Sequence, residues 1–146
     1  MRMLPVAGVL SLALLLAPPA PAVEIQGMGD FVGLHGHYGP NGNCKAFPRF
    51  QVSAAGIRFE TAAGQAEQIS TLEYAASYGG HDYNGPLQWF FPFGRDGNYP
   101  VLMTFNSEDA GRTVSIEAHD EGFPGGPQLS PRNAALVKNS PYKRCG

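Results

Sequence analysis

Apolar and polar side chains alternate over several short stretches of this chain. In the stretch 49–53, Phe50 and Val52 fall on one face of an extended segment, and polar residues occupy the other face. Residues 57–60 alternate in the same way after a short turn at 54–56 that contains a glycine. Two alternating stretches joined by such a turn are typical of a β-hairpin.

Further extended stretches are separated by turns rich in glycine, proline, asparagine and aspartate. They cover residues 68–76, 87–93, 101–106 and 113–118, and a strand is also expected around His35–Tyr38. The pattern gives about seven strands, spaced roughly every 8–15 residues, without the helix–strand alternation of a parallel sheet. It predicts a mainly β fold, either a small antiparallel sandwich or a barrel.

The C-terminal part of the chain differs in character. Ser130 and Pro131 suit the N-cap and the first position of a helix, and residues 132–138 are rich in alanine and leucine. Ser140–Pro141 ends this pattern, because the residue before a proline avoids the helical conformation. We therefore expect one short C-terminal helix, from Pro131 to about Asn139.

The N-terminal segment has the organisation of a secretory signal peptide. One positive charge at Arg2 is followed by the uncharged stretch 4–16 and by small residues at Ala20 and Ala22. The apolar run of about 13 residues is too short to span a bilayer, which takes roughly 20 residues. We therefore expect residues 1–22 to be removed, leaving one domain of residues 23–146. That domain would be periplasmic or secreted in the bacterial envelope, without stable membrane insertion.

Composition narrows the chemistry that this domain can carry. The chain has a net charge of −2, and its ten lysines and arginines are scattered, so nucleic acid is not an expected partner. Its two cysteines, Cys44 and Cys145, should form a disulfide in the oxidising compartment that export implies. The sequence holds no CxxC motif and no cysteine–histidine cluster, so no haem, structural zinc or other cofactor is expected.

His35 and His37 are weak candidates for a metal site. On a strand they would point to the same side and could share a metal ion with a third ligand from elsewhere. The opposite face would be the buried one, and it would hold Val32, Leu34 and Tyr38. Solvent-exposed histidines without a metal are therefore the favoured interpretation.

The aromatic stretch 87–93 supplies the candidate binding site. Its odd-numbered residues share one face and are expected in the core, so Phe90 on the other face is expected in solvent. The preceding loop, 78–86, is rich in glycine and polar residues. Loops on a rigid β scaffold often carry binding groups, and exposed aromatic rings offer a large contact area. The predicted ligand-binding residues are His81, Asp82, Tyr83 and Phe90.

Several stretches resemble those of small exported bacterial proteins that carry two cysteines and are largely uncharacterised. They are Tyr38–Cys44, Pro48–Phe50, Gly56, Phe59–Glu60, Trp89–Phe93 and Ser140–Cys145. The resemblance fits a disulfide between the two cysteine-bearing motifs, and it brings no activity and no site residues. Small periplasmic lysozyme inhibitors are similar in size, export and β content, but their short inhibitory motif is not recognisable in this chain.

The sequence favours a binding protein over an enzyme. It contains no GxSxG motif, no HExxH motif and no phosphate-binding loop. We therefore expect an exported, non-catalytic binding or inhibitor-like module, whose partner is an envelope protein or a saccharide. The alternatives are a small periplasmic hydrolase or metal-dependent enzyme, and a structural cell-envelope protein. A cleft gathering glutamate, histidine and aspartate would favour the enzyme, whereas an exposed aromatic patch would favour the binding module.

Overall fold

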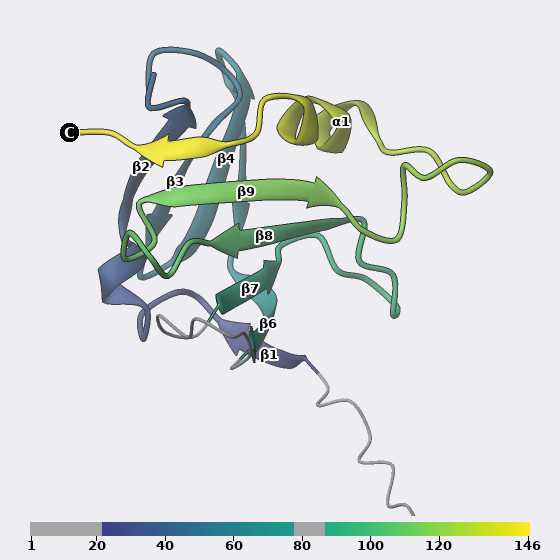
Figure 1. The fold of residues 1–146 in the computed structure, drawn as a ribbon, viewed down its shortest axis with the longest axis horizontal. Coiled ribbons are helices and arrows are strands. Elements are labelled where there is room, and N and C mark those ends of the chain that lie inside the picture. Colours follow the sequence, from purple (N-terminus) through teal and green to yellow (C-terminus); the bar gives the residue numbers. More distant parts are fainter. Residues whose placement is uncertain (1–21, 78–86) are drawn as a thin grey trace, which may run out of the picture.

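A computed structural model describes residues 22–77 and 87–146. In this part of the chain, ten strands form one antiparallel sheet that curls into a half-barrel, with one α-helix and one short 3₁₀ helix (Figure 1). The strands are β1 Val23–Gln26, β2 Gly36–Pro40, β3 Arg49–Ser53, β4 Gly56–Ala62, β5 Gln65–Ile69, β6 Thr71–Ser77, β7 Leu87–Phe91, β8 Val101–Phe105, β9 Thr113–Ala118 and β10 Tyr142–Arg144. The helices are η1 Val32–Leu34 and α1 Pro131–Lys138. The predicted class, mainly β with one short C-terminal helix, is confirmed.

The order of strands in the sheet is β1-β6-β7-β8-β9-β10-β2-β3-β4-β5. The C-terminal strand β10 therefore lies in the middle, between β9 and β2, and holds the two halves of the sheet together. Ser70 alone separates β5 at one end of the sheet from β6 near the other end. The Gly27 amide donates to the Ser70 carbonyl (2.6 Å), and the Met28 amide donates to the Ala54 carbonyl (3.0 Å). The chain itself thus connects the two sides of the curled sheet.

The predicted strand 68–76 is two strands in the structure. Its first part pairs with β4, where Ile69 lies opposite Ile57, and its second part pairs with β7, where Tyr74 lies opposite Phe90. The residue pattern does not reveal the break at Ser70 between the two strands, because the segments on both sides of it are extended. The prediction of about seven strands also missed β1 and β10, which are too short to show a clear alternation.

The core consists mainly of aromatic rings on the inner face of the sheet. Ring centroids lie 5.4 Å apart for Phe90 and Phe105, and 5.9 Å apart for Phe105 and Tyr38. Tyr38 stacks on Phe50 at 4.9 Å, and Phe50 contacts Phe59 at 5.7 Å. These distances are within the range of favourable ring contacts, so the series connects β7 with β4 through one buried interior.

The expectation that Phe90 faces solvent is wrong. Its side chain is 0% exposed, and its ring lies 5.1 Å from the rings of both Phe31 and Tyr74. Trp89 and Phe91, expected in the core, lie on the face of β7 opposite to Phe90. Trp89 is half-buried there, whereas Phe91 is buried as expected, at 9% exposure, and its ring contacts Tyr99 at 4.9 Å. Both faces of this strand are aromatic, and alternation alone does not tell which of two apolar faces points inward.

The segment around His35 also differs from the expected strand. Residues 32–34 form the 3₁₀ helix η1, and β2 begins only at Gly36. Leu34 and Tyr38 are buried as expected, whereas Val32 is 70% exposed. The helical turn changes the side-chain period from two to three, so Val32 no longer shares a face with Leu34.

The C-terminal helix begins and ends as the sequence predicts. The Ser130 hydroxyl accepts a hydrogen bond from the Asn133 amide (3.2 Å), and Pro131 is the first helical residue. Leu136 on this helix is fully buried, and its carbonyl accepts a hydrogen bond from the Tyr142 hydroxyl (2.8 Å). The helix is therefore attached to the central strand β10.

Replacing Phe90 with alanine should lower the free energy of unfolding by about 3–5 kcal/mol, because it leaves a cavity among packed rings. Urea unfolding at neutral pH measures the loss. The exposed Val32 provides the matched control, and Val32→Ala should change the free energy of unfolding by less than about 0.5 kcal/mol. Equally small losses in the two variants would contradict the burial of Phe90.

Candidate functional site

Of the predicted ligand-binding residues, only Phe90 lies in the described part of the chain, and its burial prevents it from contacting a partner. His81, Asp82 and Tyr83 lie outside the described residues. Within the described part of the chain, the candidate site consists of surface groups that the sequence pattern did not single out as a set.

The two histidine candidates have different surroundings. The Nε2 atom of His35 lies 2.8 Å from the Met28 carbonyl oxygen, so this ring nitrogen is placed to donate a hydrogen bond to the backbone. His37 is exposed on β2. Among residues 22–77 and 87–146, the structure brings together no group of three histidine, cysteine, aspartate or glutamate side chains suited to a metal ion.

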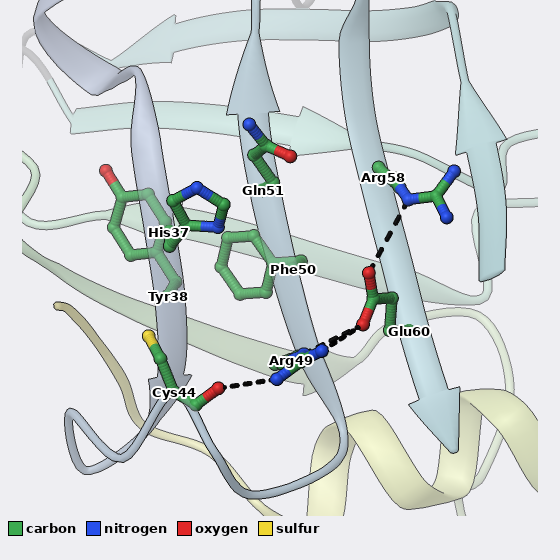
Figure 2. Close-up of a pocket in the computed structure, with 8 residues that line it drawn as sticks. All are labelled: His37, Tyr38, Cys44, Arg49, Phe50, Gln51, Arg58 and Glu60. Carbon is green, nitrogen blue, oxygen red and sulfur yellow. Dashed lines mark hydrogen bonds and ion pairs between the residues drawn. The ribbon is translucent and has the colours of Figure 1, made fainter. Parts of the chain in front are cut away.

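A hollow of about 210 Å³ lies on the outer face of β2, β3 and β4 (Figure 2). Strand register aligns its polar side chains: His37 is opposite Gln51, and Gln51 is opposite Arg58. A second row of the same face places Arg49 opposite Glu60. The lining residues are His37, Tyr38, Cys44, Arg49, Phe50, Gln51, Arg58 and Glu60.

The loop between β2 and β3 forms one wall of this hollow. It folds back over the sheet at Gly39, where a Cβ atom would collide with the Asn43 carbonyl. The Cys44–Cys145 disulfide, predicted from the sequence and present in the structure, fixes the loop to the C-terminal tail. Its sequence separation of 101 residues corresponds to a chain-entropy stabilisation of about 4–5 kcal/mol, an upper figure for a loop of this length.

Arg49 attaches the same loop to the sheet. Its guanidinium contacts Glu60 Oε2 through Nη2 (2.6 Å) and Nε (2.8 Å), and its Nη1 donates to the Cys44 carbonyl (2.8 Å) (Figure 2). The guanidinium carbon also lies 4.7 Å from the centre of the Phe47 ring. All three nitrogens of Arg49 are therefore engaged within the protein, and this side chain supports the wall.

Glu60 is held in its charged form. The hydrogen bond from Arg49 lowers the pKa of the Glu60 carboxyl below its ordinary value, and Arg58 lowers it further. Burial acts in the opposite direction but does not reverse the shift. Glu60 can thus accept hydrogen bonds, whereas a general acid at neutral pH needs a raised pKa.

Three other lining side chains have hydrogen-bonding groups to offer a ligand. The Nε atom of Arg58 lies 3.5 Å from Glu60 Oε1, a loose ion pair, and its two terminal nitrogens make no hydrogen bond to the described residues. The side chains of Gln51 and His37 likewise make none within this part of the chain. Figure 2 shows the three on adjacent strands, above the Arg49–Glu60 pair.

The surroundings of the hollow carry an excess of positive charge. Lys143 on β10 lies opposite Gly39, next to the loop, and Lys45 is exposed on the loop itself. Arg49 and Arg58 line the hollow itself, and Glu60 is the single carboxylate among the lining residues. A surface of this charge attracts anionic ligands and raises their local concentration.

Two further hollows are less suited to ligand recognition. One of about 360 Å³ lies between η1 and the β8–β9 loop, and its described lining includes no lysine, arginine or histidine. The other, of about 240 Å³, is lined by Arg132. The guanidinium of Arg132 forms an ion pair with Glu67, and its central carbon lies 3.7 Å from the centre of the Phe93 ring. The hollow on β2–β4 is therefore the candidate functional site.

Comparison with protein-family models, with curated proteins and with solved structures gives no match for this chain. Among the described residues, no helix has the length and apolar character needed to cross a membrane.

The Arg49–Glu60 contact should make stability depend on pH in one direction. A carboxyl group whose pKa is lower in the folded chain stabilises the fold above its unfolded pKa of about 4.3, and this contribution disappears as the pH falls through the folded-state pKa. Glu60→Gln should therefore lower the free energy of unfolding at pH 7, and the difference from the wild type should narrow towards pH 3. Urea unfolding over this pH range measures it.

A double-mutant cycle controls for effects unrelated to the ion pair. In an Arg49→Ala background, Glu60→Gln should cost less stability at pH 7 than it does in the wild type, because the partner is already missing. A Glu60→Gln effect that stays constant between pH 7 and pH 3, with or without Arg49, would contradict the assigned interaction.

Proposed function

We propose that this chain is an exported, non-catalytic binding module whose hollow on β2–β4 binds the carboxylate of an acidic saccharide. The observation that carries the proposal is the alignment of Arg58, Gln51 and His37 on three adjacent strands, with hydrogen-bonding groups that the described protein does not use. The Arg49–Glu60 pair and the disulfide-linked loop hold this surface in place.

The hydrogen-bonding groups of Arg58, Gln51 and His37 favour a ligand that combines a carboxylate with hydroxyl groups. A guanidinium presents its N–H groups in a planar fork that matches the two oxygens of a carboxylate, which assigns this part of the ligand to Arg58. The Gln51 amide both donates and accepts, and the His37 ring can do either through its two nitrogens, as sugar hydroxyls require. A sugar acid supplies both kinds of group.

The volume of the hollow limits what it can enclose. At about 210 Å³, it has room for roughly seven water molecules and is smaller than the 300–1,000 Å³ typical of sites that enclose a drug-sized ligand. It suits one charged group of a longer molecule, whose remaining units would lie along the open sheet surface. A polymer of acidic sugars fits this description better than a small metabolite.

The chemistry of the hollow supports binding rather than hydrolysis. Most glycosidases act through two carboxyl groups, one of them with a raised pKa, whereas Glu60 is the single carboxylate among the lining residues and its pKa is lowered. Cys44 is committed to the disulfide and is not available as a nucleophile. The disulfide is also consistent with the periplasmic or secreted location that we propose from the N-terminal segment.

Arg58→Ala should weaken the binding of an oligogalacturonate by about tenfold or more, because a charge-assisted hydrogen bond contributes about 1.5–3 kcal/mol. Titration calorimetry on the purified exported protein measures the affinity. Arg58→Lys should retain part of it, since it keeps the charge but loses the fork. Arg95, exposed on the turn between β7 and β8, gives the matched control, and Arg95→Ala should bind like the wild type.

A neutral oligogalactan of the same length tests the ligand class. It should bind much more weakly than the oligogalacturonate. Equal affinities for the acidic and the neutral sugar, unchanged affinity in Arg58→Ala, or no saturable binding of oligogalacturonate would each contradict the proposal.

A further inference from the structure

Three large apolar side chains are exposed in the described part of the molecule, and one of them is aromatic. Phe123, 50% exposed, lies in the loop between β9 and α1, residues 119–130, which we call the aromatic loop. Figure 1 shows this loop projecting from the body of the protein, away from β2. It is separate from the hollow on β2–β4.

The base of the aromatic loop continues the sheet beyond the end of β9. The amide of His119 donates to the Pro100 carbonyl (2.9 Å), and the amide of Asp120 donates to the Tyr99 carbonyl (3.0 Å). The Asp120 carboxylate accepts a hydrogen bond from the Tyr99 amide (2.7 Å). The base is therefore held by backbone and side-chain contacts to the turn that precedes β8.

The tip of the loop is closed by its own hydrogen bonds. The Gly122 amide donates to the Pro127 carbonyl (2.8 Å), and the Gly126 amide donates to the Phe123 carbonyl (3.1 Å). The Phe123 ring rests on Gly126, where a Cβ atom would collide with it. Pro124 and Pro127 restrict the backbone further. The backbone of the tip is thus restrained, and the ring packs on Gly126 while remaining half-exposed.

We propose that the aromatic loop inserts Phe123 into an apolar pocket of a partner protein, and that basic side chains surround this pocket. Aromatic side chains dominate protein–protein binding energy, and a loop that is already ordered loses little conformational freedom on binding. The ring does not belong to the buried core of this protein. This surface and its partner are additional to the proposed saccharide site.

The negative charge on and around the loop indicates which side chains should surround the partner's pocket. The loop contains no lysine or arginine, and it carries Asp120 and Glu121. Glu117, at the end of β9, is exposed next to its base. Arg95 on the neighbouring turn is offset by Asp96, 3.7 Å away. Basic residues around the partner's pocket would complement this net negative charge.

The partner can be identified by cross-linking at the loop. A photoreactive phenylalanine analogue in place of the exposed Pro124 should cross-link one main protein when the exported protein is irradiated in the envelope extract of its host. That protein, once purified, should bind the unmodified full protein, and its affinity should fall as salt rises, because exposed charges are screened.

The role of Phe123 is then measured with the purified partner. Phe123→Ala should weaken binding about 30-fold or more, as expected for an anchor residue, whereas the exposed control Val32→Ala should leave it unchanged. Phe123→Leu keeps an apolar contact with Gly126 and should give an intermediate loss. Thermal unfolding confirms that the variants stay folded.

Three outcomes would overturn the proposal. They are cross-links only to a second copy of this chain or to lipid, a partner whose affinity does not depend on salt, and equal affinities for wild type and Phe123→Ala. The saccharide titration is independent of all three, because it probes Arg58 on a different face. Failure of one proposal therefore leaves the other to be judged on its own result.

Discussion

The structure depends on the packing of aromatic rings inside the curled sheet. Phe50 is central, since its ring contacts Tyr38 on β2 at 4.9 Å, Phe59 on β4 at 5.7 Å and Tyr142 on β10 at 5.3 Å. A flat sheet could not bring these rings and Phe90 into one interior, so burying them requires the sheet to curl. Because the side chains of the inner face are buried in the core, only the outer face of the sheet and the loops can contact a ligand or a partner.

Polar contacts then fix the parts of the surface that the rings do not reach. The Tyr38 hydroxyl donates to the Leu34 carbonyl (2.8 Å) and receives hydrogen bonds from Arg144, which also donates to the Gly33 carbonyl (2.6 Å). The Cys145 amide donates to the His37 carbonyl (2.8 Å), next to the disulfide. The tail of the chain is thereby joined to β2, and the wall of the hollow gains support from both the loop and the C-terminus.

Sequence patterns predicted the features that have local causes. Alternation around Phe50 gave the β3–β4 hairpin, and Ser130 with Pro131 gave the start of the helix. The Phe90 prediction failed because β7 is apolar on both faces, and only its pairing partners decide which face is buried. The hollow was not predicted, because it combines two strand registers with a loop folded over Gly39, and these relations are not local. Among its lining residues, the sequence pattern singles out His37 only as a weak candidate for a metal site and Cys44 only as a disulfide partner.

The central claim is that the outer face of β2–β4 is a ligand-binding surface. The most direct test is to record amide ¹H–¹⁵N spectra of the labelled exported protein while oligogalacturonate is added. If this face binds the ligand, the amides of His37, Gln51, Arg58 and the loop that carries Cys44 should show saturable shifts, with little change in β7, β8 and the aromatic loop. Shifts confined to those other elements, or an unchanged spectrum, would contradict it.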